Sequence, residues 1–359
     1  MKIAIVGLPN AGKSSLFSAL TGVAAEAANY PFTTIEPNMA VVPVADRRLY
    51  AVAEVLGAMK VVPDTITFHD IAGLVAGAHR GEGLGNRFLA NIRETDAIVH
   101  VVRVHADPNV VHPEGRVDPL ADIETVETEL IYADFEQAER RLERISRAAR
   151  SGERRAIAEE AWLRALIEAL QSGRPARTVP PPADSPEALA LFSPLTAKPV
   201  LYVANVEEGA HEVPTEIAEY AASHGAAAVA ISARLEAELA ELDPEEAAAM
   251  RAELGLSESS LDAVVRGAFS LLELIAFFTG DVGKPAQSWH LRRGLTVWHA
   301  AGMIHTDIQR GFVRAEVIPW DQLVEAGGYG GARDRGTLRV EGRDYVVADG
   351  DVINVRFTP

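Results

Sequence analysis

The sequence predicts an α/β fold with a parallel-rich sheet, on the basis of three observations. An apolar run at 3–6 is followed at once by the motif Gly-x-x-x-x-Gly-Lys-Ser at 7–14 and then by an apolar-periodic helical segment. Apolar strand segments then alternate with helical segments, which is the pattern of a parallel sheet. Beyond about Ala276 the pattern changes to short strands separated by turns, which predicts a small mixed-sheet module.

The glycine-rich motif has the strand–loop–helix context that a P-loop requires. Gly7 and Gly12 permit backbone angles and close approaches that a Cβ would block. The loop N–H groups then converge on phosphate oxygens at a helix N-terminus, where the helix dipole adds to the attraction. Lys13 is expected to reach the β- and γ-phosphates of a nucleoside triphosphate, and Ser14 to hold Mg²⁺. The phosphate-binding candidates are Asn10, Ala11, Gly12, Lys13, Ser14 and Ser15.

Composition excludes several classes of protein. At 359 residues the chain is long for one core, so two or three domains are expected, and an apolar content of 48% argues against global disorder. Cysteine is absent, which removes disulfides and thiolate catalysis and suits a reducing cytoplasm. No apolar run reaches the length of a membrane span. The net charge of −17 argues against indiscriminate nucleic-acid binding, so neither a membrane nor DNA is an expected partner.

The N-terminal part is predicted to alternate helices and strands. We expect the helix after the P-loop to end near Gly22 and a polar loop to cover 30–38. The elements expected next are a strand at 39–42, a helix at about 47–58, a strand at 65–69 and a buried strand at 97–104. The strand at 65–69 leads into Asp70, at the end of the strands where ligands bind in an open α/β sheet.

The middle of the chain predicts a helical insertion. From Ile123 to about Leu170 the sequence is charged and helical without any strand signal, and Ser151-Gly152 interrupts it. Two antiparallel helices are therefore favoured over one long rod, and five prolines between 173 and 186 indicate a connector.

The α/β pattern resumes after this insertion. Strands are expected at 199–204 and 226–231, and the second leads into Ser232 and Ala233, which we count among the nucleotide-binding candidates. The expected domains are a nucleotide-binding domain at 1–118 and 196–275, an inserted helical arm at 119–195 and a C-terminal domain at 276–359. Within the last domain, strands are expected at 294–297, 312–317, 337–340, 345–347 and 352–357.

Three further positions favour a nucleotide switch over a kinase. Thr34, in the loop after the first helix, is placed to close on Mg²⁺ and the γ-phosphate. Asp70 is expected to hold Mg²⁺ through water, and the Gly73 N–H to contact the γ-phosphate. Loops of this kind order around a γ-phosphate and relax on hydrolysis. The predicted metal-binding residues are Ser14, Thr34 and Asp70.

Several motifs together resemble the YchF (Obg-like ATPase) family. They are GLPNAGKS at 7–14, FTTIEPN at 32–38, DIAGLV at 70–75, GEGLGN at 81–86, NIRETD at 91–96, NVEE at 205–208, AGMIHTD at 301–307 and RAEVI at 314–318. The resemblance covers nearly the whole chain and is weakest from about 152 to 195. It implies a G-type domain, an inserted coiled-coil arm and a C-terminal TGS domain of ubiquitin-like β-grasp fold. It also implies a cytoplasmic, ribosome-associated nucleotide switch, and we expect a monomer.

The base-reading positions depart from those of an ordinary GTPase. Guanine-specific proteins use Asn-Lys-x-Asp, whose aspartate accepts from the guanine N1–H and amine, and this chain has Asn205, Val206 and Glu208 there. Adenine offers an acceptor at N1, so a rigid aspartate repels it, whereas the longer Glu208 can swing away. Val206 supplies an apolar wall, and Asn205 can still pair with a purine edge. ATP is therefore expected to bind at least as well as GTP; the alternative is that Glu208 imitates the aspartate and guanine is kept.

The residue that follows Asp-x-x-Gly also differs from the one found in many GTPases. Many GTPases place a water-orienting glutamine there, and this chain has Leu74. In the family that the chain resembles, a histidine of an Asn-(Ile/Val)-x-His stretch takes that role, and His112 of Asn-Val-Val-His matches it. His79 is a weaker rival. Asn10 joins Lys13 and His112 as a catalytic candidate, because its side-chain carbonyl can help to hold K⁺.

These features predict a slow, Mg²⁺-dependent nucleoside triphosphatase that hydrolyses ATP and also GTP. The rival interpretation is a nucleotide-gated binding protein with guanine preference, whose hydrolysis is negligible without a partner. Leu74 favours the interpretation as a binding protein, whereas His112 and Asn10 favour hydrolysis. A metabolic kinase is disfavoured because no substrate lid or acceptor-site motif is visible.

One concentrated basic surface is expected on the arm. Its members are Arg140, Arg141, Arg144, Arg147, Arg150, Arg154 and Arg155. The alternative is a solvated helix face paired with Glu136, Glu139 and Glu143. Because the resemblance implies ribosome association, we expect this surface to contact ribosomal RNA through its phosphates.

Overall fold

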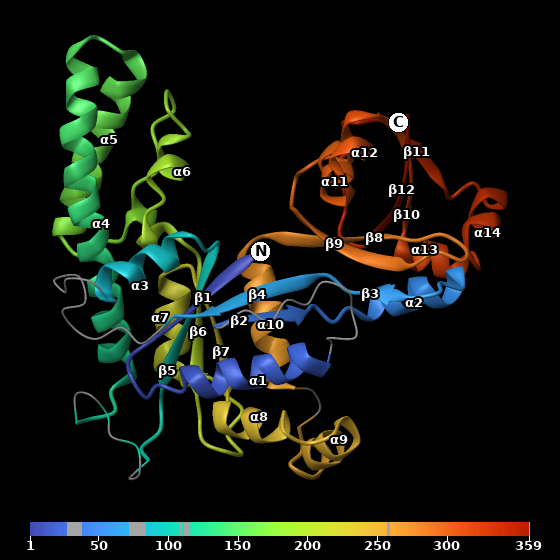
Figure 1. Cartoon of the computed structure of the whole chain (residues 1–359), viewed down its shortest axis with the longest axis horizontal. Coiled ribbons are helices and arrows are strands. Elements are labelled where there is room, and N and C mark those ends of the chain that lie inside the picture. The colour runs from blue at the N-terminus through green and yellow to red at the C-terminus, as the bar shows by residue number, and fades with distance from the viewer. Residues whose placement is uncertain are drawn as a thin grey trace. The chain divides into compact units, whose positions relative to one another are not determined.

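The computed structural model describes residues 1–26, 38–71, 84–107, 110, 112, 115–256 and 259–358 (Figure 1). The described chain forms two compact units. The first contains residues 1–25, 38–40 and 67–268, and the second contains 41–66 and 269–358. Within the described ranges, no helix is both long enough and apolar enough to cross a membrane.

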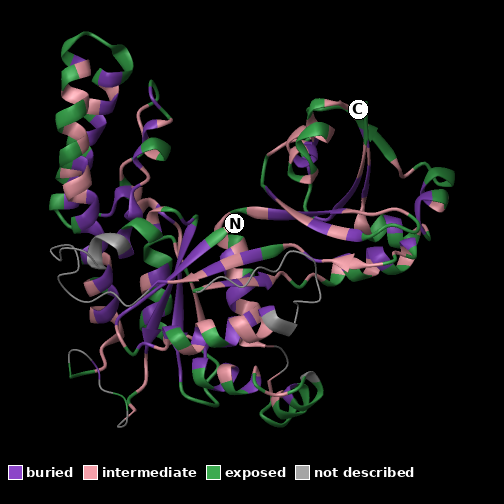
Figure 2. Ribbon diagram, viewed as in Figure 1, coloured by how far each residue is buried: buried purple, intermediate pink, exposed green. Residues whose placement is uncertain are grey.

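The first unit is built on a sheet with the strand order β2-β4-β1-β5-β6-β7. The strands are β1 (Lys2–Val6), β2 (Met39–Pro43), β4 (Thr65–Asp70), β5 (Ala97–Arg103), β6 (Val200–Asn205) and β7 (Ala227–Ile231). From β4 to β7 the neighbouring strands pair in parallel, which confirms the predicted parallel-rich sheet. All seven residues of β5 are buried at its centre (Figure 2).

Because these strands are parallel, their carboxyl ends meet at one edge of the sheet. The P-loop follows β1 at that edge, and Asp70 ends β4. The segments that begin at Val104 and Val206 follow β5 and β6, and Ser232 follows β7. Residues from five separate parts of the sequence are therefore brought to a common edge.

Helices cover both faces of this sheet. Apolar side chains of α3 (Leu84–Arg93), the first half of α4 (Pro119–Arg150) and α7 (Thr215–Ser223) pack on one face, against β1, β5 and β6. On α10 (Ser260–Leu271), Gly267 lies close to Leu201 and Val229, which belong to the opposite face. Two further helices, α8 (Ala233–Leu239) and α9 (Pro244–Glu253), follow β7.

The helix after the P-loop is longer than predicted. Helix α1 spans Lys13–Glu26 and passes through Gly22, where the sequence analysis placed its end. A Cβ on Gly22 would lie 2.6 Å from the Cβ of Ala240, so this glycine permits close packing of α1 against the end of α8. A glycine in a helical pattern can either end the helix or allow a neighbouring element to pack closely against it. Here it allows close packing, and the helix continues.

Two helices form where the sequence predicts an antiparallel pair. Helix α4 ends at Arg150, α5 (Arg154–Gln171) begins after Ser151-Gly152, and Gly152 adopts a positive φ of 85° at the turn. Ile131 and Ala138 of α4 pack with Trp162, Leu163 and other apolar residues of α5. The connector that follows contains η3 (Ala176–Thr178), α6 (Ala188–Phe192) and η4 (Leu195–Ala197).

The second unit is built on a mixed sheet with the order β11-β10-β12-β8-β9-β3. Its strands are β3 (Val61–Val62), β8 (Leu274–Thr279), β9 (Ala286–Arg292), β10 (Phe312–Pro319), β11 (Arg339–Glu341) and β12 (Asp351–Phe357). Its helices are α2 (Arg47–Leu56), α11 (Val297–Ile304), α12 (Thr306–Arg310), α13 (Trp320–Glu325) and α14 (Tyr329–Asp334). Helix α11 packs on one face of this sheet, and α2 and α13 pack on the other.

The second unit differs from expectation in several places, and its strands β8 and β9 were not predicted. Residues 41–66, expected within the nucleotide-binding domain, group with the C-terminal residues, because Leu49 and Val52 pack beside Phe278. The strand predicted at 294–297 is wrong: Thr296 begins a capping box and α11 starts one residue later. The strand predicted at 345–347 is reduced to a single bridge between Val346 and Thr296.

Candidate nucleotide-binding site

The P-loop has the backbone that its sequence predicts. Gly7 and Gly12 have φ values of 151° and 104°. A Cβ on Gly7 would lie 2.4 Å from the Val101 carbonyl oxygen, and one on Gly12 would lie 2.2 Å from the Asn205 amide nitrogen. Both glycines are therefore required by close approaches as well as by backbone angles.

Lys13 is the first residue of α1 and is held against the loop. Its ammonium donates a hydrogen bond of 2.7 Å to the Leu8 carbonyl, and its side chain is almost fully buried. Burial lowers the pKa of Lys13, and the charge of Asp70 opposes that shift. Burial likewise raises the pKa of Asp70, and the Lys13 charge opposes it. The two opposite charges thus lie close enough to stabilise each other at the phosphate end of the site.

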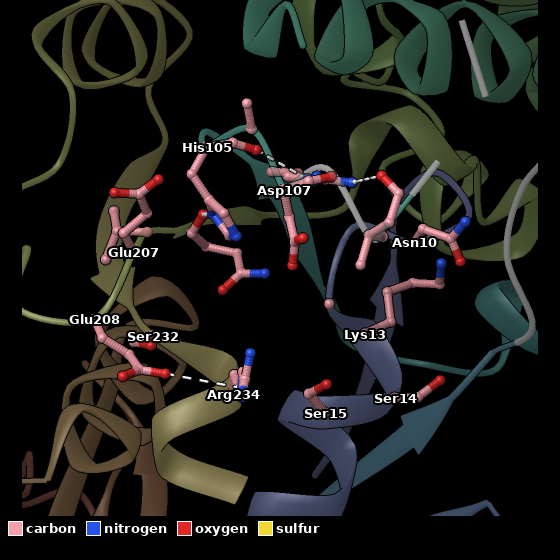
Figure 3. A pocket seen from close by; sticks show the side chains of 16 residues that line it. Asn10, Lys13, Ser14, Ser15, His105, Asp107, Glu207, Glu208, Ser232 and Arg234 are labelled. Atoms are coloured by element: carbon pink, nitrogen blue, oxygen red, sulfur yellow. Dashed lines mark hydrogen bonds and ion pairs between the residues drawn. The ribbon is translucent and has the colours of Figure 1, made fainter. Parts of the chain in front are cut away.

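A cavity of about 600 Å³ lies at this edge of the sheet (Figure 3). It is lined by residues of the P-loop, of the segment after β5 and of the segments after β6 and β7. In Figure 3 the side chains of Lys13 and Ser14 lie on one side and those of Glu207 and Glu208 on the other. The volume is within the range of small-molecule and cofactor sites.

Asn205 joins the two sides of the cavity. Its amide nitrogen donates to the Ala11 carbonyl at 3.0 Å, and its amide oxygen accepts from the Ala233 N–H at 3.1 Å. From the sequence, this side chain is predicted to pair with a purine edge. Its contacts tie the P-loop to the segment after β7 and leave one amide N–H and one lone pair of the amide oxygen for a ligand, so the pairing stays a prediction.

The other two base-reading candidates differ in exposure. Val206 lines the cavity but is only 4% exposed, and its side chain packs among core residues that include Ile217 and Ala221. Glu208 is exposed, and its carboxylate lies 3.8 Å from the guanidinium of Arg234. The hydrogen bond to Glu238 is the main cause that raises the pKa of Arg234. Ser232, the remaining nucleotide-binding candidate, is buried at the wall of the cavity.

Sequence reasoning missed the segment after β5, which supplies Arg103, His105, Ala106, Asp107 and Val110 to the cavity. Arg103 is only 3% exposed although it carries a charge. An arginine that ends a fully buried strand was the available signal, because a buried charge requires dedicated partners.

His112 does not line the cavity in this structure. It is buried, and its Nε2 lies 2.8 Å from a carboxylate oxygen of Asp122 near the start of α4. Burial is the main cause that raises the pKa of Asp122, and the hydrogen bond to His112 opposes it. The structure therefore gives His112 an acidic partner without bringing it to Lys13 or Ser14.

Five residues named in the sequence analysis lie outside the described residues. Thr34 and Gly73 were the candidates for contact with Mg²⁺ and the γ-phosphate. Leu74, His79 and Asn109 were used in the argument about the attacking water. Their predicted roles stay predictions.

The remaining metal-binding candidates are suited to Mg²⁺. Ser14 places an exposed hydroxyl at the cavity, and Asp70 supplies a carboxylate close to Lys13. Hydroxyl and carboxylate oxygens are hard ligands of the kind that Mg²⁺ prefers. In the described part of the chain, no group of three or more His, Cys, Asp or Glu residues could hold a metal by itself.

Family comparisons match both ends of the chain. A family model described as "50S ribosome-binding GTPase" matches residues 2–134. A second model, YchF-GTPase_C, described as a protein of unknown function, matches residues 274–358.

Individual relatives match over nearly the whole length. The "Ribosome-binding ATPase YchF" of Bacillus subtilis (strain 168) is 45% identical, over 98% of each chain. The protein of the same name from Haemophilus influenzae is 46% identical, over 99% of each chain. The solved structure of the Schizosaccharomyces pombe YchF GTPase has a TM-score of 0.87 and 32% identity, and covers 99% of this chain and 97% of its own. A GTP binding protein from Pyrococcus horikoshii OT3 has a TM-score of 0.64 and 21% identity, which supports the fold alone.

Proposed function

Because the chain belongs to the YchF family, we propose that it is a ribosome-associated nucleoside triphosphatase that hydrolyses ATP at least as well as GTP. One observation carries the proposal. A single cavity joins a P-loop to a base-reading segment in which Val206 and Glu208 replace the lysine and aspartate of guanine-specific proteins.

The P-loop end of the cavity is suited to a triphosphate. The N-terminus of α1 presents backbone N–H groups, and Lys13 adds a buried positive charge. Ser14 and Asp70, with Thr34, would hold Mg²⁺. When bound, the ion neutralises charge on the β- and γ-phosphates. Lys13 is already positioned by the Leu8 carbonyl, so little reorganisation is needed when the phosphates arrive.

The base end of the cavity favours adenine on chemical grounds. Val206 presents an apolar surface where a lysine stem would lie, and its burial keeps it in place. Glu208 is exposed and has Arg234 beside it, so its carboxylate has an alternative to pointing at the base. Adenine, with an acceptor at N1, is not repelled by a carboxylate that can turn away.

We further propose that His112 acts in hydrolysis, with Asp122 as the group that orients its imidazole. The 2.8 Å contact fixes the ring against α4, so the loop that carries His112 must move for the imidazole to reach water in the cavity. Asn10, at the P-loop, is the proposed contact for K⁺. Such an arrangement gives slow turnover that a partner can accelerate.

The domains and partner follow from the same family membership. We propose that the helices α4 and α5 form the projecting arm and that residues 276–359 are a TGS domain of β-grasp fold. The ribosome is the proposed partner, the cytoplasm the proposed location, and the monomer the proposed state.

Calorimetric titration of the Mg²⁺-loaded protein with ATP and with GTP tests the substrate. We expect ATP to bind as tightly as GTP or more tightly, and a strong GTP preference would contradict the proposal. Multiple-turnover phosphate release, with and without K⁺ and ribosomes, tests the enzyme. Measurable release that ribosomes or K⁺ increase is expected, whereas tight nucleotide binding without release under any of these conditions would favour a binding protein.

A further inference from the structure

Arg103, the last residue of β5, makes an unusual set of contacts. Its Nε donates to the His105 carbonyl at 2.9 Å, one terminal nitrogen to the Val110 carbonyl at 3.0 Å, and the other to the Asp107 carbonyl at 3.3 Å. The side chain is 3% exposed. All three nitrogens of the guanidinium therefore donate hydrogen bonds to backbone carbonyls that follow β5 closely in the sequence.

The residues that carry these carbonyls form one wall of the nucleotide cavity. His105, Asp107 and Val110 all line it (Figure 3). The His105 Nδ1 also donates to the Asn205 carbonyl at 3.0 Å, and the Asn205 amide in turn bonds the P-loop at Ala11. A continuous set of hydrogen bonds thus runs from Arg103 through His105 and Asn205 to the phosphate-binding loop.

We propose that Arg103 is a positioning residue for the nucleoside side of the cavity. It holds the backbone carbonyls of His105, Asp107 and Val110 in the positions that receive the nucleoside, while the P-loop receives the phosphates. The role requires arginine, because a planar fork with donors on three nitrogens can satisfy three carbonyls at once, whereas lysine has a single nitrogen. The inference rests on the proposed function, since it takes a nucleoside triphosphate as the occupant of the cavity.

The test compares ligands that share phosphates but differ in the nucleoside. Affinities of Mg²⁺-ATP, Mg²⁺-GTP and Mg²⁺-tripolyphosphate are measured calorimetrically for the parent and for Arg103→Lys. A buried polar group left without its partner weakens an equilibrium by about tenfold to 100-fold, so we expect the affinity for both nucleotides to fall by that amount. Tripolyphosphate, which needs only the P-loop side, should change by less than about threefold.

Arg177→Lys is the matched control. Arg177 is a part-buried arginine of the same unit that donates to Glu127 and to the Thr196 carbonyl, away from the nucleotide cavity. The control should lose stability without changing the ratio of ATP to tripolyphosphate affinity. If Arg103→Lys does not fold by circular dichroism, Arg103→Gln, which buries no charge, replaces it. Unchanged ATP affinity in a folded Arg103 variant would overturn the inference, as would equal losses for ATP and tripolyphosphate.

The outcomes separate this inference from the proposed function. A parent that prefers GTP refutes the proposed substrate, yet the Arg103 variant must still lose GTP affinity and keep tripolyphosphate affinity. A parent that binds tripolyphosphate as tightly as either nucleotide refutes the Arg103 inference, because the wall formed by His105, Asp107 and Val110 then contributes nothing to binding.

Discussion

The Glu208 carboxylate lies 3.8 Å from the Arg234 guanidinium, and the same guanidinium donates a hydrogen bond of 2.9 Å to Glu238. All three side chains are more than half exposed. Exposed ion pairs of this kind contribute only about 0–1 kcal/mol, so Arg234 restrains Glu208 weakly. We therefore expect base preference to depend mainly on what Val206 and Glu208 can offer a purine.

Nucleotide choice is the first prediction. Changing Val206→Lys and Glu208→Asp together should shift preference toward GTP, because an aspartate then accepts from the guanine N1–H and amine. A matched or mismatched buried polar contact is worth about 1–3 kcal/mol, so a tenfold change in the ratio of ATP to GTP affinity is expected. Equilibrium titration measures both affinities. Arg234→Met, which leaves both base-facing positions intact, serves as the control and should change the ratio far less.

Much of this site could be predicted because its signals are local in sequence. The P-loop residues lie consecutively between β1 and α1, and strand ends place Asp70, Asn205 and Ser232 at one edge. The part that could not be predicted depends on contacts between distant segments. Asn205 bonds Ala11 and Ala233, which are separated from it by 194 and 28 residues. No pattern within a short window records such a contact.

In the second unit, too, the sequence could not predict features that depend on contacts between distant segments. Thr296 follows a glycine and an apolar residue, and its neighbours are β-formers, so the local pattern favours a strand at 294–297. The observed capping box with His299 starts α11 there instead. Helix α2 was predicted, but the surface that its apolar face covers lies more than 200 residues later in the sequence. Periodicity identifies a buried face without identifying its partner.

His112→Ala is the second prediction and concerns the chemical step. The variant should lower the single-turnover hydrolysis rate by about 100-fold to 10,000-fold, as expected for a general base or water-orienting group. Nucleotide affinity should hardly change, because such a group acts mainly in the transition state. His224→Ala is the control, since His224 is an exposed histidine of the same unit that stacks on Tyr220. A rate equal to that of the parent would make His112 a bystander, and His79 would be substituted next.

The third prediction is a pH dependence of stability caused by His100. This side chain is buried in β5, and burial lowers its pKa to about 3, with the nearby Lys13 charge as a second cause. The unfolded chain protonates His100 near pH 6.5. Between about pH 6.5 and pH 3 the unfolded state therefore binds a proton that the folded state does not, and stability falls as the pH falls.

Urea unfolding at pH 7 and pH 5 measures this effect. The parent should lose about 2 kcal/mol more of its unfolding free energy over that interval than His100→Gln, which cannot titrate. The absolute stability of the variant does not matter, because only the difference between the two pH values is compared. If the parent and His100→Gln lost equal amounts of unfolding free energy between pH 7 and pH 5, His100 would have to accept a proton in the folded state.

The last prediction concerns the arm. Arg140 lies 3.5 Å from Glu136, and Arg141 lies 2.7 Å from Glu159. Arg144, Arg147 and Arg150 are exposed, and within the described chain no carboxylate forms an ion pair with them. The alternative of a helix face neutralised by its own glutamates therefore holds for only part of this surface. Arg144, Arg147 and Arg150 are therefore available to a polyanion.

Replacing Arg144, Arg147 and Arg150 with glutamate should weaken co-sedimentation with ribosomes. Contacts with RNA phosphates release counterions, so the affinity of the parent should fall steeply with salt, and the variant should show a flatter dependence. ATP turnover without ribosomes should stay unchanged, because the arm contributes no residue to the described cavity. The matched control reverses Arg292, Arg293 and Arg310 of the second unit, which makes the same change in charge elsewhere. If the control loses ribosome binding while the arm variant keeps it, the contact belongs to the C-terminal residues and not to the arm.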